Sequence, residues 1–311
     1  MGQSTVRCIL TLTAAVAPAL GLIDACSTPD QDRGPYAART RMKEPGDSAA
    51  STDAPVSSDP PVSPASVIYA HTAKALYVFD PAERNVTRIG DVDCIAPKVT
   101  ILDIAVGSEG VLFATSQAGL LRIDHKNAAC SFVKKGEKLA YPNSLAFIPR
   151  GLIDETQETL VGYQFHPDTK NHPNEATEYS RIDLADGNIT KLGELNDPAA
   201  AVKYNSSGDL ITVPGEPPRA YLTVQRLGED AGAQNDDLAE VDPKTGRVMR
   251  IVARLPADRL WGLAASAGKA YAFSAGGEVI EIDITTGAAS TVMTLKDEDG
   301  GAAAWYGAAA W

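Results

Sequence analysis

Five aspartates recur at equivalent points of repeated segments, and carboxylates in such a pattern are candidate metal ligands. Each one ends a stretch of alternating apolar and polar residues and begins a short polar segment. The five are Asp80, Asp124, Asp183, Asp242 and Asp283. An Asp at the head of a turn accepts hydrogen bonds from backbone N–H groups two residues on, and a later Gly supplies a positive φ. We therefore interpret these carboxylates as turn formers rather than metal ligands.

A second candidate for metal chemistry is one short stretch that contains His166, Asp168 and His172. Two His and one Asp are a conceivable zinc set, but loops contain such residues by chance, so we predict no metal and no other cofactor. The sequence has no Gly-rich phosphate loop, no Ser nucleophile elbow and no Cys-x-x-Cys pair, and no catalytic residue is predicted. The net charge of -12 and the pI near 4.8 argue against binding to nucleic acid or to anionic lipid.

The N-terminus combines one early positive charge with an apolar run that ends at Ile23. The run is too short to span a bilayer and is typical of a secretory signal. The segment Ile23-Asp24-Ala25-Cys26 resembles a bacterial lipobox, although that motif usually has a small or apolar residue in place of Asp24. We expect residues 1–25 to be a signal peptide and Cys26 to receive lipid. Cleavage after Ala25 by an ordinary signal peptidase is the alternative, and it would give a secreted protein.

Two further cysteines belong to the mature chain. Cys94 follows the first Asp-headed hairpin and Cys130 follows the second. Exported proteins reside in an oxidising environment, where such cysteines form disulfides. We predict a disulfide between Cys94 and Cys130, because a metal site would need more ligands nearby and none has the spacing.

Residues 26–66 are rich in Pro, Ser, Ala and Asp and almost free of aromatic residues. Such a segment cannot bury enough apolar surface to offset the entropy of ordering it. We predict a disordered tether over residues 26–66 and a folded domain over residues 67–311. With lipid on Cys26, the tether would hold the domain at the bacterial cell envelope, on the outer membrane or the cell surface.

Residues 67–311 consist of short alternating segments separated by turn residues, which is typical of an all-β protein. The repeat reads as apolar strand, strand, strand, Asp turn and strand, and the turn aspartates are 44, 59, 59 and 41 residues apart. Four strands per repeat make one blade of a β-propeller. We predict about five blades, and the longer third and fourth repeats leave a sixth open. Residues 305–311 should add the missing strand of the first blade and so close the ring.

The blade motif is clearest in Leu76-Tyr-Val-Phe-Asp-Pro-Ala-Glu-Arg-Asn-Val-Thr-Arg-Ile-Gly90. With this motif, residues 67–311 resemble the YVTN-type and WD-repeat-like β-propellers of secreted bacterial proteins, and in particular uncharacterised propeller lipoproteins. The resemblance implies the propeller fold. It leaves the function open, because propellers carry many unrelated activities.

A ligand is expected at the mouth of the central channel, where the leading strand of each blade begins. Aligning these strands by their closing turns gives five equivalent positions, which are Asp103, Ser144, Ala201, Trp261 and Tyr306. We predict a binding site formed by Asp103, Asn143, Trp261 and Tyr306, whose rings would stack against a sugar or another small polar ligand. The alternative is that the two aromatic rings only fill space between blades.

Two classes of function fit the sequence. The one we favour is a monomeric, non-enzymatic binding or interaction module at the cell envelope, with a carbohydrate or a protein as its ligand. The other is a secreted propeller glycoside hydrolase or polysaccharide lyase, in which carboxylates roughly 5 to 10 Å apart converge on the channel. Of the aligned positions only Asp103 is acidic. A clustered carboxylate pair in the channel would favour the enzyme.

Overall fold

The structure of the chain, a computed structural model, describes residues 67–136, 141–165, 170, 175–228, 235–296, 301 and 303–310. The predicted signal peptide, Cys26 and the tether lie outside the described residues, as do His166, Asp168 and His172. The described part contains twenty strands. In the same residues there is no helix long and apolar enough to cross a membrane.

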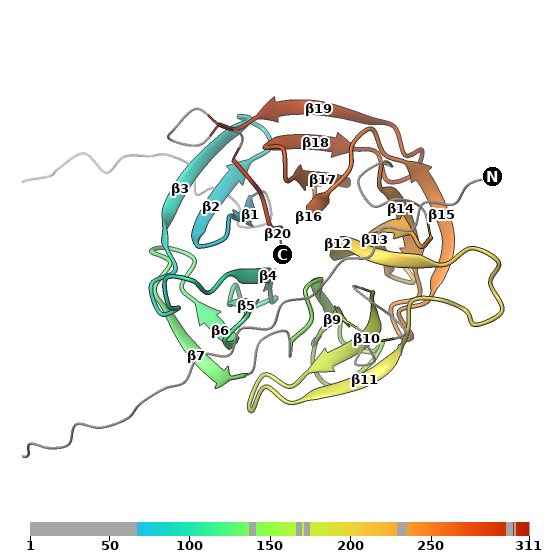
Figure 1. Cartoon of the computed structure of the whole chain (residues 1–311), viewed down its shortest axis with the longest axis horizontal. Helices are drawn as coiled ribbons and strands as arrows, with labels where there is room; N and C mark the ends of the chain where they lie inside the picture. The colour runs from blue at the N-terminus through green and yellow to red at the C-terminus, as the bar shows by residue number, and fades with distance from the viewer. Residues whose placement is uncertain are drawn as a thin grey trace, which may run out of the picture. The chain divides into compact units, whose positions relative to one another are not determined.

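The strands pair into five antiparallel sheets of four strands each, arranged as the blades of a ring (Figure 1). In chain order they are β1 (Ile68–His71), β2 (Ala75–Asp80), β3 (Asn85–Asp91), β4 (Ile101–Val106), β5 (Leu112–Ser116), β6 (Gly119–Ile123), β7 (Cys130–Lys135), β8 (Leu145–Ile148), β9 (Thr159–Phe165), β10 (Ala176–Ile182), β11 (Ile189–Glu194), β12 (Tyr204–Val213), β13 (Arg219–Arg226), β14 (Asp237–Val241), β15 (Val248–Arg254), β16 (Leu260–Ser266), β17 (Lys269–Ser274), β18 (Glu278–Ile282), β19 (Ala289–Thr294) and β20 (Gly307–Ala309).

Blade 1 has the strand order β20-β1-β2-β3, and blades 2 to 5 follow as β4 to β7, β8 to β11, β12 to β15 and β16 to β19. The first strand of each blade lies nearest the centre and the last lies on the outside (Figure 1). The prediction of an all-β propeller with five four-stranded blades is confirmed. The long third and fourth repeats add no further sheet in the described residues.

The ring is closed by pairing the two ends of the domain. β20 lies antiparallel to β1, with Ala309 opposite Tyr69 and Gly307 opposite His71. The first blade therefore takes its inner strand from the C-terminal end of the chain, as predicted. Every blade then has four strands, and no blade is left with a missing inner strand.

The Asp-headed turns join the third and fourth strands of each blade. In every turn the Asp Oδ1 accepts a hydrogen bond from the backbone N–H two residues on, at 2.8 or 2.9 Å. Four residues after the Asp the backbone has a positive φ, at Gly in blades 3 to 5 and at Arg84 and Ala128 in blades 1 and 2. The interpretation of these aspartates as turn formers is confirmed.

The inner strand of blade 4 differs from the sequence expectation. The repeat pattern predicts a leading strand over residues 200–208, closed by a turn at Ser206-Ser-Gly208, with a second strand directly after it. The structure instead has one continuous strand, β12, with a bulge between Ser206 and Leu210, and the second strand is β13. Gly208 is needed because a side chain there would collide with the carbonyl oxygen of Leu260 in the next blade.

The hydrophobic core consists of five clusters, each formed between two neighbouring blades. Between blades 5 and 1, for example, Phe79, Phe273 and Trp305 are fully buried, and the Phe273 ring lies edge-on to the other two. The predicted disulfide between Cys94 and Cys130 is present and ties the connection between blades 1 and 2 to β7. The channel is thus surrounded by blades that are packed against each other on both sides.

Candidate functional site

The two aromatic residues of the predicted mouth lie together. The Trp261 and Tyr306 ring centroids are 5.2 Å apart, with 54° between the ring planes, and both side chains are half-buried. Asn143 precedes the inner strand of blade 3, and its Oδ1 is buried without a hydrogen-bond partner. Asn143 and Tyr306 are equivalent by their backbone pairing, because each donates its N–H to the residue opposite it on the second strand. The structure therefore places three of the four residues at one level of the channel.

Asp103 lies one level deeper than the other three predicted residues and is fully buried. The difference arises from β-bulges that precede Asp103 on β4 and Gly262 on β16. By strand pairing, the residues equivalent to Asp103 are therefore Gly262 and Gly307, not Trp261 and Tyr306. The alignment by closing turns was therefore displaced by one residue in blades 5 and 1.

The deeper level contains one residue from each inner strand. By the pairing of each inner strand with its neighbour, the five are Asp103, Ser144, Asp209, Gly262 and Gly307. Two are acidic and three are small, so two carboxyl groups occupy the axis. Asp209 was not predicted, because the alignment of leading strands by their closing turns gives Ala201 at this position. The signal that would have found it is the Gly-Asp-Leu-Ile run of β12, in which an acid interrupts a buried strand.

Backbone amides from four inner strands hold the two carboxyl groups. Asp103 accepts from the N–H of Ile104 at 2.6 Å through Oδ1 and from the N–H of Leu145 through Oδ2. Asp209 Oδ2 accepts from the N–H of Leu263 at 3.1 Å and from that of Ala308 at 2.7 Å. These donors belong to β4, β8, β16 and β20. The carboxyl groups thus satisfy inner strand edges that would otherwise carry unpaired N–H groups.

Burial raises the pKa of both carboxyl groups well above the ordinary range, because a charge in this environment has lost its water. The charge of Asp209 raises the pKa of Asp103 further, while backbone N–H groups act in the opposite direction on both. The channel therefore does contain a clustered carboxylate pair. Both residues have no exposed surface, so a polysaccharide cannot reach them while the ring stays closed.

His71 is buried beside this level. Its Nδ1 donates to the carbonyl of Thr72 at 2.8 Å, and its Nε2 has no hydrogen-bond partner. Burial lowers the pKa of His71 to about 4, so the ring is neutral near pH 7. Any side chain at position 307 would collide with Asp103 Oδ1 and His71 Nε2, which is why Gly307 is required.

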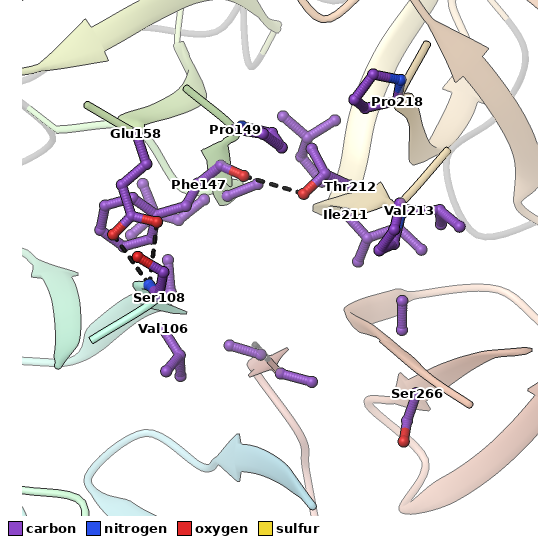
Figure 2. Close-up of a pocket in the computed structure, with 18 of the residues that line it drawn as sticks. Val106, Ser108, Phe147, Pro149, Glu158, Ile211, Thr212, Val213, Pro218 and Ser266 are labelled. Atoms are coloured by element: carbon purple, nitrogen blue, oxygen red, sulfur yellow. Dashed lines mark hydrogen bonds between the residues drawn. The ribbon is translucent and has the colours of Figure 1, made fainter. Parts of the chain in front are cut away.

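A cavity of about 1290 Å³ opens at the other end of the channel, where the inner strands end (Figure 2). We call it the funnel. Its wall includes Val106, Phe147, Ile211 and Val213, which come from β4, β8 and β12. The funnel lining does not include Asp103, Asn143, Trp261 or Tyr306.

Two polar side chains of the funnel wall bond to a neighbouring blade. Both carboxylate oxygens of Glu158 accept from the backbone N–H of Ser108, at 2.9 and 3.0 Å. The Thr212 hydroxyl donates to the Phe147 carbonyl at 3.0 Å (Figure 2). These contacts join blades 2 and 3 and blades 3 and 4, and the lining also contains the polar side chains of Glu109, Arg150, Gln157, Ser266 and Lys269 beside its apolar ones. In the described part of the chain, no three His, Cys, Asp or Glu residues are grouped to hold a metal ion.

The fold and site define a five-bladed β-propeller whose channel is blocked by a carboxyl pair and whose other end opens into an apolar funnel. No family model and no curated protein matches the chain. Similar solved structures include a protein of unknown function from Bacteroides caccae, with 10% identity, 78% of this chain and 97% of that chain covered, and a TM-score of 0.37.

Two further solved structures are similar to the chain at low identity. BamB from Moraxella catarrhalis has 15% identity, with 72% of this chain and 57% of that chain covered and a TM-score of 0.34. The WD40 β-propeller domain of Doa1 has 10% identity, with 76% of this chain and 67% of that chain covered and a TM-score of 0.34. These similarities concern the propeller fold alone.

Proposed function

We propose that the chain is a non-enzymatic binding domain of the bacterial cell envelope whose ligand enters the funnel. The observation that carries the proposal is the funnel itself, a cavity of about 1290 Å³ lined by inner-strand residues of several blades. A cavity lined mainly by apolar side chains, with a minority of polar groups among them, is a typical ligand site. The carboxyl pair above the funnel makes it a blind cavity rather than a passage.

The funnel suits an apolar segment of a protein better than a carbohydrate. Sugars are usually held by aromatic platforms and convergent hydrogen-bonding groups, whereas Phe147 is the single aromatic residue in the described lining. Glu158 and Thr212 are already engaged in bonds between blades. An apolar side chain or segment would gain by covering this wall, because buried apolar area is worth about 25 cal/mol per Å².

A carbohydrate remains the second candidate ligand, at the opposite mouth. Trp261 and Tyr306 form an aromatic pair there, and both side chains are only half-buried. This observation supports a sugar site separate from the funnel. The two candidates differ in location, so single substitutions distinguish them.

The anchor is tested by the intact mass of the protein purified from the membrane fraction of its own host. We expect a mass increment of one diacylglyceryl group and one acyl group on Cys26, and its loss in Cys26→Ser. An unmodified mature chain in the medium would contradict the anchor. It would leave the binding domain as a diffusible protein.

The funnel is tested with the neutral apolar fluorophore N-phenyl-1-naphthylamine. Val213 is half-buried and lines the cavity, so Val213→Asp places a charge on its apolar wall. We expect saturable binding to the wild-type protein and at least about tenfold weaker binding to Val213→Asp, since a desolvated charge costs more than 1 kcal/mol. Val202→Asp is the matched control, because Val202 is 47% exposed and outside the lining. Equal binding to both variants would place the probe elsewhere and count against the proposal.

A further inference from the structure

We propose that Asp103 and Asp209 form a buried proton-binding site that closes the central channel, with one proton shared between the two carboxyl groups in the folded protein. The site lies between the aromatic mouth and the funnel. The proposed proton site does not depend on which ligand binds at the aromatic mouth or in the funnel.

The arrangement of the blades brings the two aspartates together. Asp103 is on β4 of blade 2 and Asp209 is on β12 of blade 4, so the two side chains reach the axis from blades that are not neighbours. The equivalent residues of the other three blades are Ser144, Gly262 and Gly307, which leave the space that two carboxyl groups require. A larger residue on any of these strands would compete with the pair for the axis.

The hydrogen bonds indicate which carboxyl oxygen has room for the proton. Asp103 accepts one backbone N–H on each oxygen, while Asp209 accepts both of its backbone N–H groups on Oδ2. Asp209 Oδ1 is fully buried and has no hydrogen-bond partner. Two ionised carboxylates at this depth would repel each other strongly, so one must be protonated. Asp209 Oδ1 is the oxygen without a competing donor, and as O–H it can donate to Asp103.

Few other titratable or polar groups face the pair. From β8 the Ser144 hydroxyl is already bonded to Ser206 and to the Gly208 carbonyl, both at 2.6 Å. From β1, His71 Nε2 borders the same space beside Gly307 as Asp103 Oδ1, and burial lowers the pKa of His71 to about 4, so the ring is neutral at pH 7 and above.

A further buried acid of blade 4 is Asp236. It accepts from the N–H of Leu260 at the start of β16 at 2.8 Å and has its pKa raised to about 6 by burial. β16 and β20 contribute only Gly262 and Gly307 at the level of the pair.

The proton gives folding a specific pH dependence. Two unfolded aspartates titrate near pH 3.9, so above that pH the folded pair binds one proton more than the unfolded chain. The folding equilibrium constant then falls about tenfold per pH unit for as long as the pair keeps its proton. Asp236 also makes the folding equilibrium constant fall with rising pH, but it stops contributing to this pH dependence above about pH 6. His71 makes the folding equilibrium constant rise with pH, and this rise is complete above about pH 6.5. The range from pH 7 to 9 therefore isolates the pair.

The test is urea denaturation of the purified full-length protein between pH 7 and 9, with two single variants. In Asp209→Asn the amide oxygen accepts from Leu263 and Ala308, and the NH₂ group donates to Asp103 in place of the shared proton. In Asp103→Asn an NH₂ group must face the N–H of Ile104 or Leu145, because both Asp103 oxygens are acceptors. Asp236→Asn is the control, since it removes another buried acid but leaves the pair intact.

We expect the wild-type folding equilibrium constant to fall by up to about tenfold per pH unit from pH 7 to 9 and that of Asp209→Asn to stay constant. Asp236→Asn should keep the wild-type slope. At pH 7, Asp103→Asn should fold with an equilibrium constant roughly 10- to 100-fold below that of Asp209→Asn. A flat wild-type profile, or equal destabilisation by the two variants, would overturn the proposal. If Asp103→Asn does not fold, the comparison of wild type with Asp209→Asn still decides it.

Discussion

Side chains at the channel axis and at the blade interfaces each have a defined partner. Asp103 and Asp209 bind amides of four inner strands, and Gly307 leaves room for Asp103 and His71. At the interface of blades 3 and 4, the buried Tyr163 hydroxyl donates to the Gly246 carbonyl at 2.5 Å. The ring is therefore held by polar contacts between blades as well as by apolar packing.

The Tyr163 hydrogen bond yields a prediction at the residue scale. Tyr163→Phe leaves a buried carbonyl without a partner and should lower the free energy of unfolding by about 1 to 3 kcal/mol in urea denaturation. Tyr221→Phe is the matched control, because Tyr221 is also buried but its hydroxyl has no partner. We expect that change to be neutral or stabilising. A loss of stability in Tyr221→Phe as large as in Tyr163→Phe would contradict this account of the hydroxyl groups.

Asp103 and Asp209 show how far single residues can be read from the sequence. Asp103 was identified because it stands in an apolar strand with a regular closing turn. Asp209 was missed because the alignment depended on a turn at Ser206-Ser-Gly208, which the structure shows as a bulge. The pairing of Trp261 with Tyr306 on neighbouring blades was predicted, but their level relative to Asp103 was not. Bulges shift a strand by one residue, and the partner strand that reveals the shift is distant in sequence.

At the scale of elements, the Asp-headed turns also hold neighbouring blades together. Gly246 closes the turn between β14 and β15 with φ 70°, and a side chain there would collide with the Tyr179 ring of blade 3. The Tyr179 hydroxyl donates to the Pro243 carbonyl in the same turn at 2.8 Å. Each glycine in this position thus allows both a positive φ and a close approach between blades.

Two glycine substitutions separate these roles. Gly268 has φ 78° in the turn after β16, and a Cβ there would meet no neighbouring atom. Gly268→Ala should therefore cost about 1 to 2 kcal/mol of stability from backbone strain alone. Gly246→Ala should cost roughly 1 to 3 kcal/mol more, because the methyl group overpacks the interface. Equal losses in thermal or urea denaturation would mean that the Tyr179 contact does not constrain this turn.

Elements with a local cause were predictable from the sequence. The aspartate turns depend on residues within a few positions of each other, and all five were recognised. The continuous strand β12 was not, since Gly208 is needed for Leu260 of the next blade rather than for a local turn. Its Ser-Ser-Gly sequence reads equally well as a turn when the neighbouring blade is unknown.

At the scale of the whole molecule, repeat length and the strand-like C-terminal segment were sufficient to predict ring closure and about five blades, with a sixth left open. The funnel was not predicted. Its walls depend on how the ends of β4, β8 and β12 and the loops after them stand around the axis, and this is set by blade packing rather than by any local motif. The carboxyl pair lies between the two mouths of the channel, so we treat the mouths as separate sites. Each mouth therefore needs its own test.

The measurement that tests the central claim most directly is titration of N-phenyl-1-naphthylamine into wild type, Val213→Asp and Trp261→Ala side by side. Val213 lines the funnel, whereas Trp261 belongs to the opposite mouth and is outside the funnel lining. The account predicts that Val213→Asp weakens binding at least about tenfold while Trp261→Ala leaves it unchanged, because the carboxyl pair separates the two sites. Loss of binding in Trp261→Ala with full binding in Val213→Asp would place the apolar site at the other mouth and contradict the account.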